Sequence, residues 1–506
     1  MKKGVVAGIV IGILALGGIG GSLALPDRAE DYVRDTIARA ALPGYDRAEC
    51  DDVRISLLQR TVTISNLRLA GPGGEHRCRE LTLRPTLPLM LATAVPPLRS
   101  LLLPTSGPVI LGTMEAQDIT GHILRDVAPL TPKMPTSRLE TGAAALSFLD
   151  MQVDASLLSR LLNGEKFAVQ DLTGRAGAAR IHAASVRLRQ PNLCSLEIKK
   201  LRLNDVLTDF SIALCEAEDV SIADTSGGMN KSCSLLRLTD ISIPPNILKT
   251  IIADMPFFPS GLERAVSKAA AKHTLYRNVT LENGTLSFAY EAPETCSVKR
   301  VFSDVDPDMR KGILQIERLY IPPRLLFGEL PHIPGMDKLL LDCTWEHTRN
   351  NDRSRENISL TVADMGHITT DLEYTANADI LSPDADLQTL LGVQFKKVYI
   401  RYEDRGGIAR ILAEQEHPTE TLRQLDMLAA QFSAMLPEAS KPLIEALRTT
   451  LRTPGTLEIR LREGMEITVP ELLADIASHG LGRSFEASAV PGKENVTDQI
   501  LRVQTQ

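Results

Sequence analysis

Apolar residues recur along this chain in a spacing of two pairs separated by two mostly polar residues. The clearest copy reads V-T-I-S-N-L-R-L at residues 62–69, with Val62, Ile64, Leu67 and Leu69 as its apolar positions. A β-strand alternates its side chains between two faces, so the two pairs would ordinarily point in opposite directions. One bulged residue in the middle resets the alternation and brings all four side chains to one face. The spacing therefore predicts short, bent, half-buried strands.

The same spacing returns in strong and weak copies. Strong copies lie at 146–153, 196–203, 236–243, 314–321 and 393–400, and weaker ones at 76–83, 114–121, 167–174, 181–188 and 215–222. An apolar content of 43% produces some such spacings by chance. However, the second central residue is often Asp, and the continuation I-S-I-P-P-N-I-L at 241–248 matches L-Y-I-P-P-R-L-L at 319–326. We therefore interpret the strong copies as a repeat.

The apolar positions of the repeat are the candidate residues for a shared apolar face that meets lipid. They are Val62, Ile64, Leu67, Leu69, Leu196, Ile198, Leu201, Leu203, Leu236, Leu238, Ile241, Ile243, Leu314, Ile316, Leu319, Ile321, Val393, Phe395, Val398 and Ile400. Whether their faces join into an open groove or close on a solid core is left open by the pattern.

The first 25 residues determine the expected compartment. Lys2 and Lys3 precede an uncharged run at 4–25 that is long enough to cross a bilayer as a helix. The two lysines would stay in the cytoplasm, which places the remaining chain on the far side. A cleaved signal peptide is the alternative, because S-L-A at 22–24 offers small residues. The run is longer than a typical signal core, so we favour an uncleaved anchor.

Two further stretches carry local predictions. Residues 81–112 are strongly apolar, but prolines interrupt them every few residues, which excludes a lipid-facing helix and predicts extended segments and turns. Asn283-Gly284 is the strongest short signal for a β-hairpin turn in the chain.

The order of elements predicts an α+β protein that is mainly β. A transmembrane helix precedes an elongated, curved antiparallel β-rich body, groove-like or sandwich-like, and a helical subdomain lies near the C-terminus. The predicted divisions are an anchor at 1–25, an amphipathic helix at 26–44, a β-rich unit at 45–255, a helical linker at 256–275, a second β-rich unit at 276–405, a helical subdomain at 406–480 and a flexible tail at 481–506.

Composition and cysteine usage narrow the function classes. The net charge of −7 and the lack of a basic stripe interleaved with aromatic residues argue against a nucleic-acid partner. Seven cysteines in 506 residues are too few for a disulfide scaffold. Cys50 and Cys78 flank the first repeat strand, and a disulfide between them is one option in an oxidising compartment. The other option, which we favour, is that the cysteines are small buried apolar residues.

No catalytic constellation is found in the sequence. The nine histidines are scattered, Glu346-His347 lacks a second His at helical spacing, and phosphate-binding glycine motifs and a G-x-S-x-G elbow are missing. Aspartates alternate in S-D-V-D-P-D-M at 303–309, but the bidentate Glu of an EF-hand is not present. We therefore expect neither an enzyme nor a cofactor or metal site.

Two stretches carry a resemblance to known proteins. They are L-T-L-R-P-T-L-P-L-M-L and P-P-L-R-S-L-L-L-P-T-S-G-P-V-I-L within 81–111, which follow the membrane helix, the amphipathic helix and the first bent strand. In this order residues 1–120 resemble AsmA-type proteins and the related YdgA-like envelope proteins of Gram-negative bacteria. The stretch V-Y-I-R-Y-E-D-R-G-G-I-A-R-I-L at 398–412 resembles a strand-to-helix junction in YdgA-like proteins. The resemblance implies long β-grooves that carry lipid across the periplasm, and it identifies no site residue.

These observations predict a single-pass protein of the bacterial inner membrane with most of its chain in the periplasm. Membrane lipid, bound or passed along an apolar β-groove, is the expected partner, together with other envelope proteins. The alternative is a non-enzymatic scaffold or partner-binding protein of the inner membrane, in which the bent strands close on a solid core.

Overall fold

The fold was analysed in a computed structural model of the chain. It describes residues 26–39, 46–56, 58–72, 74–94, 96–125, 137–162, 175–191, 194–207, 211–224, 228–243, 275–288, 294–306, 310–322, 339–376, 391–413, 415–479 and 482–505. The predicted membrane helix at 1–25 and residues 256–274 of the predicted linker lie outside these residues. None of the described helices combines the length and the apolar character needed to cross a membrane.

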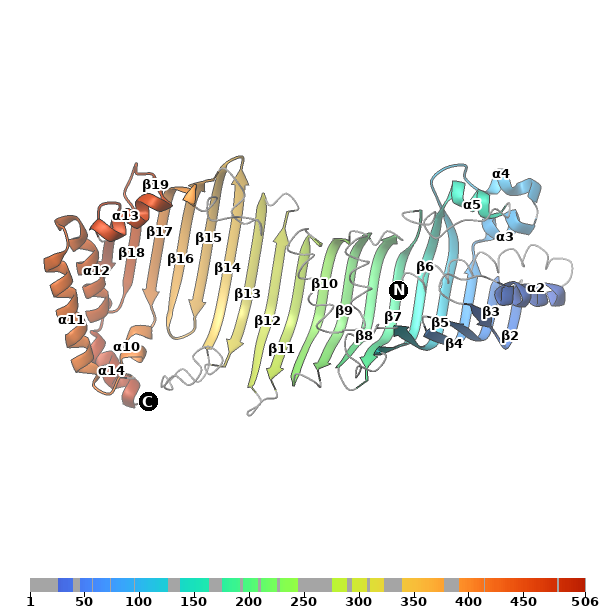
Figure 1. Ribbon diagram of the computed structural model, residues 1–506, viewed down its shortest axis with the longest axis horizontal. Coiled ribbons are helices and arrows are strands. Elements are labelled where there is room, and N and C mark those ends of the chain that lie inside the picture. Colours follow the sequence, from blue (N-terminus) through green and yellow to red (C-terminus); the bar gives the residue numbers. More distant parts are fainter. Residues whose placement is uncertain are drawn as a thin grey trace. The chain divides into compact units, whose positions relative to one another are not determined.

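The chain divides into two compact units, Met1–Arg277 and Asn278–Gln506, and both are mainly β as predicted (Figure 1). In unit 1, β1 (Arg47–Glu49) and β2 (Asp52–Ser56) pair with the same edge of β3, and each later strand pairs antiparallel with the next. The later strands are β3 (Thr61–Gly71), β4 (Gly74–Pro85), β5 (Pro108–Arg125), β6 (Ser137–Asp154), β7 (Ala176–Gln190), β8 (Cys194–Leu207), β9 (Ser211–Asp224) and β10 (Met229–Ser242).

The sheet of unit 2 follows the same rule. Its strands are β11 (Asn278–Phe288), β12 (Glu294–Val305), β13 (Lys311–Ile321), β14 (Leu339–Asn350), β15 (Arg353–Val362), β16 (Gly366–Thr375), β17 (Gln394–Asp404), β18 (Thr456–Leu461), β19 (Ile467–Thr468) and β20 (Phe485–Val490). Each strand from β11 to β18 pairs with the next, β19 extends the β17 edge, and β20 pairs with β18. Among the described strands each unit is therefore a single layer of antiparallel strands.

The predicted bend in the middle of the repeat is confirmed, but its mechanism differs from a bulge in most copies. The central residue has a left-handed backbone with φ between 49° and 53°, at Asn66, Asp118, Asp150, Ser185, Asp219, Asp240 and Arg318. The pairing register does not change across the bend in β3, where Ser65 faces Glu80 and Leu67 faces Cys78. β3 and β4 thus switch faces at the same level without an inserted residue, whereas the register shifts at the copy 146–153, where Gly112 of β5 faces Met151 and Met114 faces Phe148. Asp and Asn dominate because their short polar side chains tolerate this conformation.

Inserted residues do occur at two repeat copies in unit 2. The register shifts between Ile316 and Leu319 of β13, and again where Glu373 and Tyr374 of β16 meet β17. At these two places the predicted bulge is present.

The hairpin predicted at Asn283-Gly284 is wrong. Asn283 lies in the middle of β11 with a φ of 49°, so it is another left-handed bend. A Cβ at Gly284 would lie 2.6 Å from a Leu281 side-chain carbon and 2.9 Å from one of Val298. Inside the strand, Asn283 therefore supplies the left-handed residue. Gly284, which has no side chain, leaves room for the side chains of Leu281 and Val298.

The left-handed bends give a first testable prediction. Asp240 is exposed, and no described residue forms an ion pair with it. Its substitution therefore tests the effect of the left-handed backbone conformation on stability. We expect Asp240→Val to lower the free energy of unfolding by about 1–2 kcal/mol, because a β-branched side chain disfavours the left-handed region. Asp240→Asn should leave it unchanged. Urea unfolding of the full-length variants measures the difference, and equal stability of all three proteins would contradict the role of the bend.

Helices cover the first part of the unit 1 sheet and seal its core. The helices are α2 (Pro26–Arg39), α3 (Leu87–Ala94), η1 (Pro96–Leu98), α4 (Arg99–Leu102) and α5 (Ala155–Leu162) (Figure 1). Val33 and Ile37 of α2, Leu89 of α3 and Leu157 of α5 are at most 1% exposed and belong to one cluster with the β3 side chains. The amphipathic helix is confirmed over 26–39, whereas the stretch at 81–112 contains helices that its prolines did not predict. Pro88 lies in the first turn of α3 and Pro96 and Pro97 lie in the short η1, where a helix tolerates them.

The face of each sheet opposite the apolar side chains carries ladders of ion pairs across neighbouring strands. Glu216 of β9 lies between Arg202 of β8 and Arg237 of β10, and its side chain is only 11% exposed. Asp371 of β16 accepts hydrogen bonds from Arg355 of β15 and Lys397 of β17. In such an antiparallel sheet the charged face can contact water while the apolar face packs against apolar groups.

The ladder at Glu216 predicts a pH-dependent stability. Arg237 above all, and then Arg202, hold the pKa of Glu216 below its ordinary value despite its burial. A depressed folded-state pKa stabilises the fold above the unfolded pKa of about 4.3, and this stabilisation is lost as the pH falls towards the folded pKa. Glu216→Gln should therefore cost about 1–3 kcal/mol at neutral pH. The difference from wild type should shrink in acid, which urea unfolding at several pH values measures. The exposed pair of Glu197 with Arg187 is the control, and Glu197→Gln should change little at any pH.

The C-terminal region combines helices with the last strands of the sheet. The helices are α10 (Gly407–Ala413), α11 (Pro418–Met435), η4 (Glu438–Ser440), α12 (Lys441–Arg452), α13 (Val469–His479) and α14 (Val496–Thr505). Asp404 caps α10, since its carboxylate accepts hydrogen bonds from the backbone N–H groups of Gly406 at 2.8 Å and Ile408 at 3.0 Å.

The predicted flexible tail at 481–506 is wrong. It contains β20, which extends the sheet, and α14, whose Val496 and Ile500 are at most 4% exposed against Ala409 and Leu412 of α10. The sequence of α14 is polar overall, but its two buried residues are four apart and so lie on one helix face.

Candidate functional site

The structure brings the four apolar residues of each strong repeat copy to one face of its sheet, and the weak copy at 167–174 lies outside the described residues. The fully buried candidates are Val62, Ile64, Leu67, Leu69, Leu203, Ile241 and Val393. The half-buried candidates are Leu196, Ile198, Leu201, Leu236, Leu238, Ile243, Leu314, Ile316, Leu319, Ile321, Phe395, Val398 and Ile400. The copies therefore share a face but differ in how well that face is covered.

The first copy does not line an accessible surface, which corrects its assignment as a lipid-contact site. Val62 and Ile64 are 0% exposed, and they belong to the same core as Val33 and Ile37 of α2. A ligand would have to displace a helix to reach them. This part of the sheet is a closed core.

The copies in β8 and β10 lie on the same face of the sheet, but their apolar side chains are less buried. Ile198 of β8 lies opposite Val220 of β9, and Leu236 of β10 lies opposite Ala217 on the other edge of β9. Leu196, Ile198, Leu236 and Leu238 all lie outside the buried core cluster of unit 1 and remain half-buried. Across β9, Leu236 is level with Leu201 and Ile198 is level with Cys233, so the apolar strip on these three strands consists of two rows.

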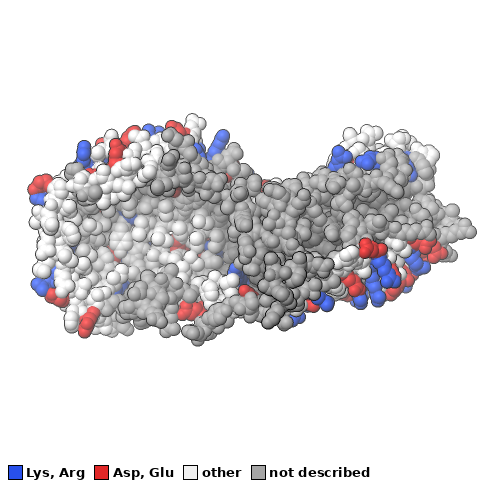
Figure 2. Space-filling model, viewed as in Figure 1, with Lys and Arg blue, Asp and Glu red and all other residues white. Residues whose placement is uncertain are grey.

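Unit 2 presents a wider face of the same kind. Ile316 of β13 lies between Val301 of β12 and Cys343 of β14, and Leu314 lies opposite Trp345. Phe395 and Val398 join the small buried clusters near β17. In Figure 2 unit 2 is hollowed, with mostly uncharged residues on the floor and charged side chains along the rim.

A polar cluster interrupts this face on β14, β15 and β16. Glu356 of β15 accepts hydrogen bonds from the Tyr374 hydroxyl at 2.6 Å and the Trp345 indole N–H at 3.2 Å. His347 is 3% exposed, and its Nδ1 lies 3.7 Å from Oε1 of Glu356. His347 first, and then Tyr374 and Trp345, hold the pKa of Glu356 below its ordinary value although burial opposes this.

The sequence analysis missed this cluster. Its members come from three strands, so no linear motif joins them, and Glu346-His347 was considered only as half of a helical metal motif. The sequence signal for the cluster was the single Trp of the chain, Trp345. It lies two residues before His347 in the same strand, so the two side chains share a face.

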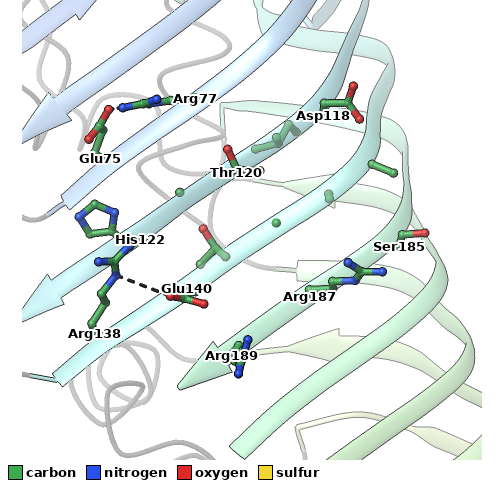
Figure 3. Close-up of a pocket in the computed structure, with 16 residues that line it drawn as sticks. Glu75, Arg77, Asp118, Thr120, His122, Arg138, Glu140, Ser185, Arg187 and Arg189 are labelled. Atoms are coloured by element: carbon green, nitrogen blue, oxygen red, sulfur yellow. Dashed lines mark hydrogen bonds and ion pairs between the residues drawn. The ribbon is translucent and has the colours of Figure 1, made fainter. Parts of the chain in front are cut away.

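A separate hollow of about 720 Å³ lies on the sheet of unit 1 (Figure 3). Thr120 and His122 of β5, Arg138 of β6 and Arg187 of β7 line it, and alternation places them on the face opposite Ile119. Most of its charges are already paired, as Arg77 is with Glu75 at 2.7 Å and Arg138 with Glu140 at 3.8 Å. The hollow is a concave part of the charged face.

The disulfide considered between Cys50 and Cys78 is not formed, and both thiols are free. Cys50 lies between β1 and β2 on one edge of β3, whereas Cys78 lies in β4 on the other edge. Two inter-strand spacings separate their backbones by about 9.5 Å, and a disulfide spans at most about 7 Å. Burial raises the pKa of both thiols, as it does for small apolar core residues.

Comparisons with known proteins assign no activity to this geometry. A family described as "Uncharacterized protein" matches residues 358–483, a span from within β15 to just beyond α13. The match includes Tyr374 and Phe395 but begins after Glu356. No curated protein matches the chain.

Proposed function

We propose that this protein binds membrane lipid along the apolar faces of β8–β10 and β11–β17. The observation that carries the proposal is a run of half-buried apolar residues across neighbouring strands, backed by a ladder of ion pairs on the opposite face. Half-buried Leu, Ile and Val side chains in adjacent strands form a contiguous patch, and such patches mark interaction sites. An acyl chain offers the continuous apolar surface that would complete their burial.

The proposed location follows from the sequence. The uncharged run at 4–25 after Lys2 and Lys3 would anchor the chain in a bacterial inner membrane, with both units in the periplasm. The resemblance of residues 1–120 to AsmA-type proteins supports the same placement and the same class of ligand. An anchor would keep the apolar faces within reach of their lipid source.

Photo-crosslinking of the full-length protein in bacterial cells tests lipid binding. A photoreactive residue replaces Ile198 or Ile316 on the apolar faces, and in matched controls it replaces Glu197 or Gln315, the preceding residue on the opposite face. Mass spectrometry then counts lipid adducts. We expect several-fold more adducts from the apolar positions, and equal adducts at all four positions would overturn the proposal.

A second candidate function, binding of a partner protein, is favoured by the surface of α11. Leu428, Phe432 and Met435 are 48%, 55% and 82% exposed and follow one another along the helix at intervals of four and three. Leu422 and Leu425 pack instead against the small core shared with α10 and α14. The exposed stripe is therefore free for a partner.

Cross-linking in cells tests this second candidate. Phe432→Asp should abolish any cross-linked protein complex while the wild-type fold is retained. Recovery of monomer alone from wild type would count against a scaffold role.

A further inference from the structure

The polar cluster on the unit 2 face has an unbalanced set of hydrogen bonds. Neither ring nitrogen of His347 forms a hydrogen bond, since its Nδ1 lies 3.7 Å from Oε1 of Glu356, although the side chain is only 3% exposed. A buried polar group left unpaired costs about 1–3 kcal/mol, so a native protein keeps one only for a reason. A bound group would supply the missing partner.

The cluster is also unbalanced in charge. Among the described residues, no Lys or Arg lies within ion-pair distance of Glu356, whose contacts are His347, Trp345 and Tyr374. Oε1 accepts a hydrogen bond from Tyr374 and Oε2 accepts one from Trp345, and each oxygen retains capacity for another. The carboxylate lies on an otherwise apolar part of the sheet, beside Ile358 and opposite Leu372. Its complement is a cation that arrives from outside.

Two aromatic side chains, Trp345 and Tyr374, donate hydrogen bonds to the carboxylate. The Trp345 ring stacks on His347 with centroids 5.8 Å apart, and Tyr374 meets Phe395 edge-on at 6.2 Å. Gly312 of β13 leaves room for the indole, since a Cβ there would lie 3.2 Å from a Trp345 ring carbon. Aromatic residues are only 4% of the chain, and its single Trp is here. Carboxylate and aromatic faces together are the chemistry that recognises an ammonium group.

We propose that Glu356, His347, Trp345 and Tyr374 bind the ammonium headgroup of an amine-bearing lipid whose chains lie on the apolar face of unit 2. This inference rests on the proposed lipid-binding function. The carboxylate neutralises the ammonium, a ring nitrogen of His347 accepts a hydrogen bond from one of its N–H groups, and the indole lies beside it. Glu356 repels a phosphate or carboxylate headgroup. A hydroxyl headgroup is uncharged and leaves the Glu356 carboxylate without a counterion.

The fluorescence of Trp345 reports binding at the cluster, because it is the only Trp in the chain. The full-length protein in a non-ionic detergent is titrated with dodecylammonium, dodecanol and dodecanoate at equal concentrations. We expect dodecylammonium to bind at least tenfold more tightly than dodecanoate. Glu356→Gln should remove this preference, whereas Glu346→Gln, an exposed carboxylate of β14 on the opposite face, should retain it.

The outcomes separate this inference from the proposed function. Equal affinity of wild type for the three amphiphiles overturns the ammonium site, while lipid cross-links at Ile316 would still support lipid binding. Failure of all three to bind, together with an absence of cross-links, overturns both. The wild-type comparison of headgroups needs no variant, so it decides the matter even if Glu356→Gln does not fold.

Discussion

Ile64→Ala should lower the free energy of unfolding of unit 1 by about 2–5 kcal/mol, whereas Ile198→Ala should cost only about 1 kcal/mol. Both residues occupy the second apolar position of a strong repeat copy. Ile64 is 0% exposed beneath α2, so its truncation leaves a cavity that the helix and sheet cannot fill. Ile198 is half-buried on the strip of β8–β10, so its truncation leaves a space that solvent can reach.

Trp345 fluorescence reports only on unit 2, and both variants lie in unit 1. Hydrogen exchange measured by mass spectrometry is therefore used to compare them. Protection should fall across β3 and its neighbours in Ile64→Ala and remain close to wild type in Ile198→Ala. Equal losses in the two variants would mean that β8–β10 belong to a sealed core, and this would also count against lipid binding on that strip.

Ile500→Ala should destabilise unit 2 by a further large amount, about 2–5 kcal/mol. Ile500 is 4% exposed and packs with Val496 against Ala409 and Leu412 of α10, so its truncation loosens both helices. The next residue is the control, since Leu501 is 58% exposed and Leu501→Ala should change stability by less than about 0.5 kcal/mol.

Urea unfolding followed by Trp345 fluorescence measures this difference in unit 2. A loose tail would leave the unfolding midpoint unchanged in both variants. Unequal midpoints, with only Ile500→Ala shifted, confirm that α14 is part of the fold.

The bent strands were predictable from the sequence because a local rule governs them. Two apolar pairs around a short polar centre specify which residues share a face, whichever strands come to lie beside them. The left-handed residues at Asp150 and Asp240 occur where that spacing places its second central residue. The pattern did not reveal that neighbouring strands bend at the same level, since register depends on both partners.

Local signals were misleading where the neighbouring strand decided the outcome. Asn283-Gly284 has the chemistry of a hairpin turn, but pairing of Gly284 with Val298 keeps it inside β11. Cys50 and Cys78 are close along the chain, yet β3 separates them. α14 reads as a polar tail because the surface of α10 that buries Ile500 lies far away in the sequence.

The sequence by itself determined the strands, their bends and the face on which each apolar quartet lies, because backbone alternation and left-handed propensity are local properties. Only the tertiary structure decided which quartets are sealed and which remain half-buried. Val62–Leu69 and Leu196–Leu203 share one pattern, but all four residues of the first quartet lie in the buried core, whereas only Leu203 of the second does. The tertiary structure also assembled Glu356, His347, Trp345 and Tyr374 from three strands. Strand register decides which residues become cross-strand neighbours, and no sequence motif encodes that register.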